Sequence, residues 1–338
     1  MGVASYPDDE EFLMSKISVV IPTRNRPSDV REVINDILNQ TNKPKEIVII
    51  DGSDDERTYE VYLSFLERAR KEGVPLKYIK DPRMGLTVAR NIAVREVSGE
   101  YVMFLDDDVR LGNRVLEIIE NFLDSHPDIL AVQPYIFEPR KIKVNTLKNC
   151  LYRVFLLPYY ADNKYIVMRS FKSNNLRKLT RTIRPQRLGG CAFCVRKKVF
   201  NAIKFDEKLR GYSYMEDMDF TYRLYKMFPG SLAIIPRAKV LHKRSEVARM
   251  NVHELSLMKN VYWAYLFFKN MADSALNIIA FLYSFIIGRL IIQGLKVLVR
   301  RDRNSILTFL SLINAIKYVM IHIKEIMEGS LEFFNKTL

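Results

Sequence analysis

Three consecutive carboxylates, Asp106-Asp107-Asp108, follow directly on the apolar run Tyr101–Leu105. Adjacent anions repel one another unless a cation lies among them, and hard divalent metals prefer oxygen ligands. Five consecutive apolar residues are typical of a central strand covered on both faces, and open α/β sheets bind ligands at the carboxyl ends of their strands. The cluster therefore favours a site for a divalent metal and a phosphate-bearing ligand. The alternative is a solvated turn in which Asp108 or Asn113 caps a helix.

A second group of acids, Glu216-Asp217 with Asp219, lies where a loop enters a helical pattern. A helix N-terminus stabilises carboxylates as anions, and such a carboxylate can act as a general base toward a hydroxyl group. The alternative is simple capping of the helix by Asp217, with Arg223 as its ion-pair partner. His242 follows an apolar strand pattern, where a single histidine is commonly structural.

The order of apolar runs predicts the elements that hold these side chains. Strands are expected at 17–21, 46–50, 76–79 and 101–105, and helices at 28–38, 59–71 and 85–97. This alternation with short connections is typical of an α/β protein with a parallel sheet. Because parallel strands end at the same edge, we expect one rim to carry the following residues: Thr23, Arg24, Asp51, Arg90 and the three carboxylates.

The rim lacks the usual glycine-rich phosphate loops. No GxGxxG follows the first strand and no GxxxxGK[ST] occurs in the chain, which argues against dinucleotide-binding and ATPase sites. A nucleotide diphosphate bound here would rely on a metal instead of a glycine loop and a helix terminus.

In the second half of the chain we expect a helix at 111–123, a strand at 129–132, a Gly189-Gly190 turn into a strand, and an apolar strand at 232–235 with its continuation at 238–241.

Four motifs in this order resemble the nucleotide-binding half of family 2 glycosyltransferases, over roughly residues 16 to 245. They are Ser18-Val19-Val20-Ile21-Pro22-Thr23-Arg24-Asn25, Ile49-Ile50-Asp51-Gly52-Ser53, Gly85 with Ala89-Arg90-Asn91, and Asp106-Asp107-Asp108. The resemblance implies a GT-A fold, inverting chemistry and a nucleotide-sugar donor. It predicts a tail at 1–15, a GT-A domain at 16–250 and a helical region at 251–338.

The resemblance also implies roles for individual residues. Pro22, Thr23 and Arg24 would line the pocket for the base and ribose, and Asp51 would hydrogen-bond the base edge. Arg90 would lie near the base or the diphosphate, while Asp106 and Asp107 would hold the ribose. Gly190 would face the donor sugar and the acceptor.

The catalytic and metal-binding roles follow from the same resemblance. Asp217 corresponds to the general base of the family's Glu-Asp motif, with Glu216 orienting the acceptor and Asp219 and Arg223 in support. Asp108 and His242 would hold a divalent metal, Mn²⁺ or Mg²⁺, that neutralises the departing diphosphate.

Charge and hydropathy point to an anionic partner. The 338 residues carry a net charge of +14, and the basic segment, residues 140–187, contains thirteen Lys or Arg and one acid.

The two cysteines of Cys191-Ala192-Phe193-Cys194 lie in an apolar run and are expected to be small buried residues. The acidic N-terminus has no apolar core of a secretory signal. Residues 275–299 and 305–323 are mostly apolar but contain charges, which favours helices lying in a membrane interface over a spanning pair.

Together with these patterns, the resemblance implies a metal-dependent inverting glycosyltransferase at the cytoplasmic face of the cell membrane. A UDP- or GDP-sugar would be the donor and a lipid-linked or other glycan the acceptor, and no nucleic acid is expected as a partner. Two alternatives are open: a sugar-phosphate nucleotidyltransferase, and a basic RNA-binding protein that would explain the +14 charge.

Overall fold

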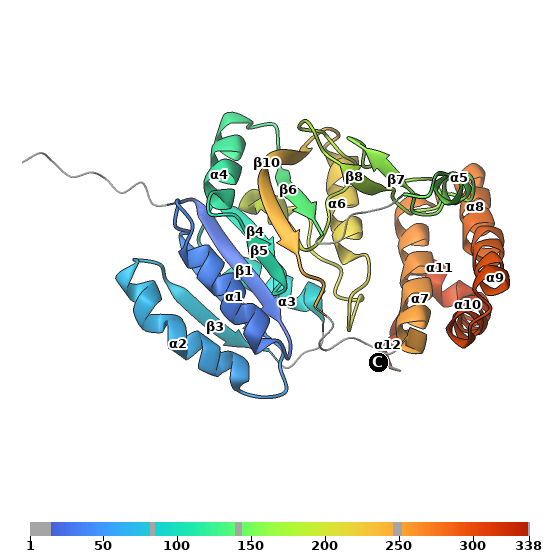
Figure 1. Cartoon of the computed structure of the whole chain (residues 1–338), viewed down its shortest axis with the longest axis horizontal. Coiled ribbons are helices and arrows are strands. Elements are labelled where there is room, and N and C mark those ends of the chain that lie inside the picture. Colours follow the sequence, from blue (N-terminus) through green and yellow to red (C-terminus); the bar gives the residue numbers. More distant parts are fainter. Residues whose placement is uncertain (1–14, 82–84, 139–143, 246–251, 337–338) are drawn as a thin grey trace, which may run out of the picture.

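The computed structural model describes residues 15–81, 85–138, 144–245 and 252–336. Most of the predicted tail at 1–15, the start of the basic segment and the predicted boundary at residue 250 lie outside these ranges. Within them, a twisted sheet flanked by helices forms one part of the molecule, and the C-terminal helices lie along one side of it (Figure 1).

The central sheet has eight strands in the order β3-β2-β1-β4-β9-β6-β10-β5. Its strands are β1 (Ile17–Thr23), β2 (Glu46–Asp51), β3 (Leu76–Lys80), β4 (Tyr101–Leu105), β5 (Val109–Leu111), β6 (Ala131–Phe137), β9 (Ala192–Arg196) and β10 (Leu232–His242). Strands β1 to β4 are mutually parallel, as predicted. Strand β9 runs antiparallel to both β4 and β6, so the sheet is mostly parallel, as expected for this α/β fold, with an antiparallel strand inside it.

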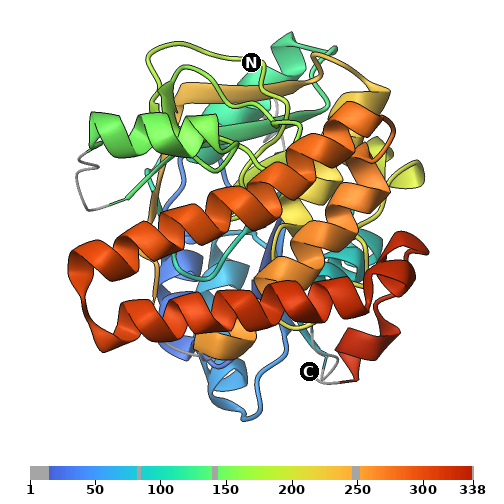
Figure 2. The same ribbon diagram turned by 90° about the vertical axis from the view of Figure 1, so that its right-hand side faces the viewer.

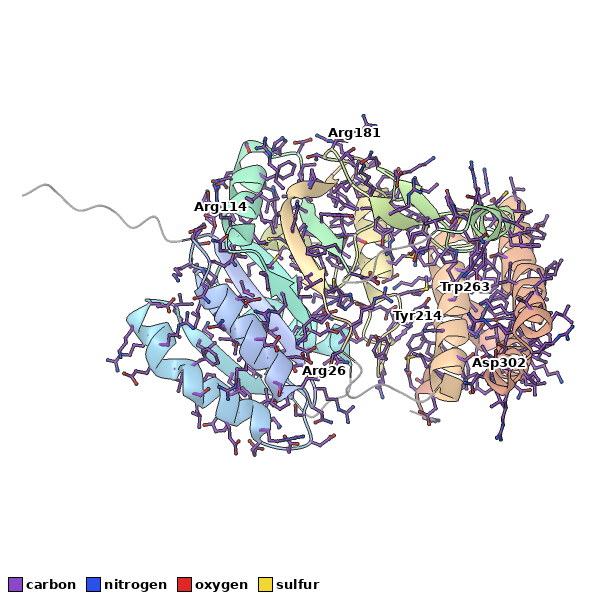
Figure 3. All side chains as sticks on the ribbon, in the orientation of Figure 1. Arg26, Arg114, Arg181, Tyr214, Trp263 and Asp302 are labelled. Atoms are coloured by element: carbon purple, nitrogen blue, oxygen red, sulfur yellow. The ribbon has the colours of Figure 1, made fainter. Side chains whose placement is uncertain are left out.

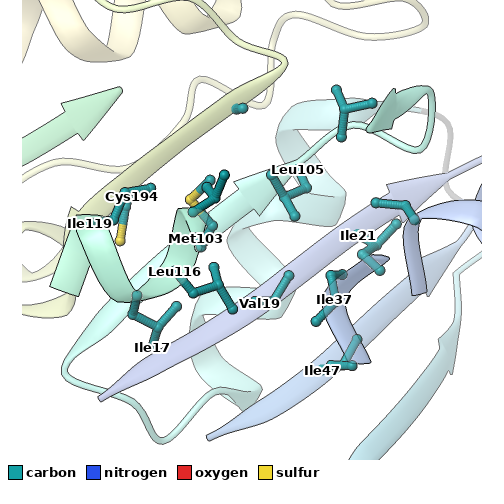
Figure 4. Close-up of a cluster of buried hydrophobic side chains, with 14 of the residues drawn as sticks. Ile17, Val19, Ile21, Ile37, Ile47, Met103, Leu105, Leu116, Ile119 and Cys194 are labelled. Carbon is teal, nitrogen blue, oxygen red and sulfur yellow. The ribbon is translucent and has the colours of Figure 1, made fainter. Parts of the chain in front are cut away.

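Helices cover both faces of the sheet. They are α1 (Pro27–Leu38), α2 (Arg57–Lys71), α3 (Leu86–Glu96), α4 (Val115–Ser125) and α6 (Glu216–Met227). Alternate residues of each central strand enter opposite cores: Met103 of β4 packs with α1, α2 and α4, whereas Phe104 packs with α3 and α6. Figure 4 shows the first of these clusters, including Cys194, which is a free buried cysteine as expected. Burial on both faces explains the uninterrupted apolar runs.

The structure corrects one predicted element near the acidic cluster. The segment expected to begin a helix at Leu111 instead forms β5, which pairs antiparallel with β10, and the helix α4 begins at Val115. The strand expected at 232–235, with its continuation at 238–241, is confirmed as β10, whose pairing with β6 shifts register between Ile235 and Lys239. Strand β5 directly follows Asp108, so this pairing brings the end of β10 back to the acids.

The basic segment forms small elements at the edge of the molecule. They are α5 (Thr146–Val154), β7 (Tyr160–Asp162) and β8 (Asn175–Lys178), and the short helix η1 (Lys197–Asn201) follows β9. Phe155 beyond α5 packs against Tyr283 of the C-terminal helices, at 5.7 Å between ring centroids. The segment therefore joins the part of the molecule that contains the sheet to the C-terminal helices.

The C-terminal region is helical throughout its described residues. It comprises α7 (Val252–Met271), α8 (Ala275–Leu282), the π-helical turn η2 (Tyr283–Gly288), α9 (Arg289–Arg300), α10 (Arg303–Ile321), α11 (Ile323–Met327) and α12 (Glu332–Asn335). Helices α9 and α10 lie side by side on one face of the molecule (Figure 2). Helix α7 shares one hydrophobic core with Phe171, Leu209 and Met218, which lie in the part of the molecule that precedes it in the chain.

Candidate active site

The ends of β1, β2 and β4 form the rim that the sequence predicts. The backbone N–H of Gly52 donates to the carbonyl of Thr23 at 3.0 Å, and the hydroxyl of Thr23 donates to Asp107 at 2.7 Å. Asp107 also accepts from Arg26, at 2.9 Å. Burial raises the pKa of Asp107 to about 7, although the Arg26 charge opposes that shift. Asp107 is thus held by β1 and its following loop.

Asp51 is fully buried at the end of β2. Its carboxylate accepts a hydrogen bond from the Tyr78 hydroxyl at 2.6 Å and from its own turn at Ser53 N at 2.8 Å. Burial and the Asp51 hydrogen bond both raise the pKa of Tyr78. Arg24 instead points toward the outer loop, where it pairs with the exposed Asp54 at 3.2 Å.

Asp106, Asp108 and His242 form a compact set of metal-ligand atoms. One ligand atom from each lies within 4.8 Å of the others, and His242 Nε2 is 3.3 Å from Asp108 Oδ1. The pairing of His242 with Val109 across β10 and β5 creates this proximity. The predicted pair Asp108 and His242 therefore lies together, and Asp106, which the sequence suggested as a ribose ligand, lies with them.

The electrostatics of this set fit a missing positive charge. Burial raises the pKa of Asp106; Arg90 opposes the shift and Asp108 adds to it. Burial also opposes ionisation of Asp108, but the hydrogen bond and charge of His242 hold its pKa below the ordinary value. Two carboxylate oxygens and one imidazole suit a divalent ion such as Mn²⁺.

Arg90 of α3 joins the two acidic clusters. Its guanidinium donates to Glu216 at 2.8 Å, to Asp106 at 3.3 Å and to the Gly190 carbonyl at 2.8 Å. It is 0% exposed and lies against the ring of Phe193. The resemblance implies a place near the base or the diphosphate, and the structure shows this side chain buried between the two acidic clusters.

Glu216 and Asp217 occupy the first turn of α6. The turn begins at Met215, whose φ of 71° is in the left-handed region, and no side-chain hydrogen bond from a described residue caps it. The Asp217 carboxylate is therefore not engaged in a capping hydrogen bond. Burial and the neighbouring Asp217 raise the pKa of Glu216, and Arg90 opposes the shift.

Gly190 packs directly against these two acids. A Cβ at this position would lie 3.0 Å from the Cβ of Asp217 and 3.1 Å from Glu216 Oε1. The absence of a side chain thus permits the close approach of β9's leading turn to α6. The charge of Asp217 also acts on Asp106, so the second acidic cluster borders the metal-ligand set.

Asp219 lies apart from this centre. It accepts from Arg223 at 2.8 Å, from Lys269 at 3.0 Å and from Asn270 at 2.9 Å, and so anchors α7 to α6.

Arg187 is a site residue that the sequence reasoning missed. Its guanidinium lies 3.7 Å from Asp217 Oδ2, and its only sequence signal was membership of the basic segment.

The chain is similar in sequence to known glycosyltransferases. The family description "Glycosyl transferase family 2" matches residues 18–203. The chain is 32% identical over 123 residues to the cholesterol galactosyltransferase of Borreliella burgdorferi, an alignment covering 36% of this chain and 33% of that protein. It is 28% identical over 149 residues to the poly(ribitol-phosphate) beta-N-acetylglucosaminyltransferase TarS of Staphylococcus aureus (strain Mu50), covering 43% of this chain and 25% of TarS. The chain thus matches a third or less of each of these two relatives.

Two solved structures share the architecture. The S. aureus TarS structure of residues 1–349 superimposes with a TM-score of 0.52 at 17% identity, covering 88% of this chain and 80% of that chain. The GalNAc-T7 structure with UDP, GalNAc and Mn²⁺ gives a TM-score of 0.57 at 18% identity, covering 77% of this chain and 48% of that one. These likenesses confirm the predicted GT-A fold. With the match over more than half of its length, the chain belongs to glycosyl transferase family 2.

Proposed function

We propose that the protein transfers a sugar from a nucleotide-diphosphate donor to an acceptor hydroxyl with inversion of configuration. Asp217 takes the proton of the acceptor hydroxyl, whose oxygen forms a bond to the anomeric carbon from the face opposite the leaving group. The bond between that carbon and the diphosphate oxygen breaks, and the nucleoside diphosphate leaves with the electron pair. One observation carries the proposal: Asp217 makes no capping hydrogen bond to α6 and lies beside Gly190 and the metal-ligand set.

The remaining residues of the rim take supporting roles. Asp51 and Thr23 border the base and ribose pocket, and Arg90 fixes Glu216 and Asp106 relative to one another. A divalent cation held by Asp106, Asp108 and His242 would neutralise charge on the leaving diphosphate. The Mn²⁺ and UDP in the GalNAc-T7 structure's name support this for a protein of the same fold.

A panel of UDP- and GDP-sugars, read by thermal shift and by hydrolysis, tests the donor and metal proposals together. We expect at least one donor to raise the unfolding temperature in the presence of Mn²⁺ or Mg²⁺ and to lose this effect with a chelator. Asp108→Asn should weaken metal-dependent donor binding about tenfold or more, because it removes an anionic ligand. The matched control is Asp128→Asn, which changes an exposed acid that is paired with Arg184. Donor binding that is the same with and without chelator would contradict the metal assignment.

The C-terminal helices support association with a membrane surface. The segments Ala275–Arg300 and Arg303–Ile321 are long and apolar enough to cross a membrane, by length and composition alone. Their outer faces expose large apolar side chains, among them Leu298 at 68% and Val299 at 81%. Basic residues on the same helices suit an anionic leaflet. We therefore propose that α8 to α10 lie on the cytoplasmic face of the cell membrane and present a lipid-linked or glycan acceptor to the site.

Flotation with vesicles of phosphatidylcholine and phosphatidylglycerol tests this attachment. We expect the full chain to float with the vesicles and the double variant Leu298→Glu/Val299→Glu to lose about tenfold or more in binding, since each buried apolar side chain contributes about 1.5–3 kcal/mol. The control, Leu63→Glu/Leu66→Glu, changes two exposed leucines on α2. Equal loss in both double variants would show that the effect is not specific to α9.

A further inference from the structure

Lys172, in the basic segment, is a buried lysine at the boundary between the catalytic part and the C-terminal helices. Its residue is 8% exposed. Its Nζ lies 3.4 Å from the Tyr214 hydroxyl and 4.1 Å from the centroid of the Trp263 ring. Figure 3 labels Tyr214 and Trp263 at this boundary. No ion pair joins Lys172 to a carboxylate anywhere in the part of the chain that the structure describes, which is unusual because buried lysines are nearly always paired.

Arg289 of α9 brings a second cation to the same place. Its Cζ lies 5.5 Å from the centroid of the Trp263 ring, and its guanidinium donates to the side-chain carbonyl of Asn260. It too has no carboxylate partner among the described residues. Burial lowers the pKa of Lys172 well below its ordinary value, and the charges of Arg289 and of Lys259 on α7 add to that shift. Contact with an aromatic ring offsets only part of the cost of burying a cation.

A further cation, Arg187, lies on the acceptor side of the active site. Tyr214 precedes Glu216 and Asp217 in the same loop, and Arg187 lies 3.7 Å from Asp217. Burial raises the pKa of the Tyr214 hydroxyl, while the charges of Arg289 and Arg187 oppose that shift. Tyr214 is therefore within electrostatic range of both Arg289 and Arg187. Arg187 is paired with Asp217, whereas Lys172 and Arg289 have no carboxylate partner among the described residues.

We propose that Lys172, Tyr214 and Arg289 bind a phosphate group of the acceptor, so that a hydroxyl of the same molecule reaches Asp217. This inference rests on the proposed glycosyl transfer and names the acceptor class: a phosphoester that also carries hydroxyl groups. The phosphate oxygens accept hydrogen bonds from Lys172 Nζ and the Tyr214 hydroxyl and supply the counter-charge that the described carboxylates do not. The same chemistry occurs in a water-soluble polyol phosphate and in a lipid headgroup, which the experiment separates.

Inorganic phosphate is the first probe, titrated into the full chain by calorimetry without divalent metal. Lys172→Met should weaken phosphate binding about tenfold or more, as expected for loss of a charge-assisted hydrogen bond. The wild type should also take up protons on binding, visible as an enthalpy that depends on the buffer, because an anion reverses the lowered pKa of Lys172. The matched control Lys178→Met removes an exposed lysine of the basic segment and should bind as the wild type does. Equal binding by the two variants overturns the proposal.

A structural role for Lys172 predicts a different pattern. If the ammonium only tethers Trp263, Lys172→Met should lower the unfolding temperature and leave phosphate binding unchanged. Under our proposal the unfolding temperature stays the same or rises, because an apolar side chain replaces a buried amine that has no carboxylate partner among the described residues. Tyr214→Phe, which keeps the ring and removes the hydroxyl, is the second variant and should also weaken phosphate binding.

Competition against phosphate identifies the source of the ligand. Glycerol 3-phosphate and micelles of dihexanoyl-phosphatidylglycerol represent the water-soluble and the lipid form. Displacement that depends on Lys172 supports the proposal and assigns the acceptor to the form that displaces better, whereas displacement by neither overturns it. Nucleotide-sugar binding by the wild type, measured in parallel, reports on the proposed glycosyl transfer independently. A chain that binds donor but shows no Lys172-dependent phosphate binding refutes this inference alone.

Discussion

Asp217→Asn should reduce glycosyl transfer by about a hundredfold to ten-thousandfold, the range that general base catalysis contributes. The amide cannot accept the acceptor proton, but it has nearly the same shape and keeps the contact with Gly190. The fold and the binding of the donor should therefore be preserved. The measurement is the initial rate of transfer to the acceptor, with donor binding followed separately by thermal shift.

The control for this variant is the same change at Asp128, whose carboxylate is exposed and remote from the predicted site residues. Asp128→Asn should transfer sugar at the wild-type rate. If Asp217→Asn retained full transfer activity, the assignment of the base would be wrong, and Glu216 would be the next candidate in the same turn.

Arg90→Met should destabilise the fold by about 3–5 kcal/mol, the usual cost of removing one partner of a buried ion pair. Glu216 and Asp106 would lose their shared counter-charge, and the Gly190 carbonyl would lose its donor. Arg90→Lys should rescue the fold only in part, because an ammonium cannot hold three acceptors in the planar arrangement of a guanidinium. The free energy of unfolding is measured by urea denaturation.

The effect of Arg90→Met should also depend on pH. Burial raises the pKa of both Asp106 and Glu216, and Arg90 lowers them, so removing Arg90 penalises the ionised forms. The loss of stability should therefore be largest at high pH and shrink as the pH falls and the acids become protonated. Arg114→Met is the control, since the Arg114–Glu117 pair is exposed to solvent and contributes little to stability. A variant as stable as that control would refute the positioning role.

The rim of the site could be predicted from sequence because it depends on local pattern. Apolar runs that end in polar residues locate strand ends, and parallel strands end at one edge, so Thr23, Asp51 and Asp107 were expected together. The antiparallel pairing of β5 could not be predicted in the same way. A three-residue strand has no period of its own, and the hydrogen bonds that define it come from β10, far along the chain.

The contacts of Arg90 and Lys172 could not be predicted from the sequence, for a different reason. A helical pattern shows that one face of α3 is apolar, but the acids across from Arg90 come from β4 and α6. Lys172 is one cation among thirteen in the basic segment, and only its packing against Tyr214 and Trp263 distinguishes it. Helices were expected after residue 251, but the core that α7 shares with the catalytic part was not.

The register shift in β10 makes the number of residues between Ile235 and Lys239 a determinant of the proposed metal site. Side chains alternate between the two faces of a strand, so one residue more or fewer between Ile235 and Lys239 would turn every later side chain to the opposite face. His242 would then point away from Asp108, while the strands on the far side of the sheet kept their contacts. An insertion of a single residue there would thus keep the fold but abolish the function. Substitutions at nearby positions would not reveal this sensitivity.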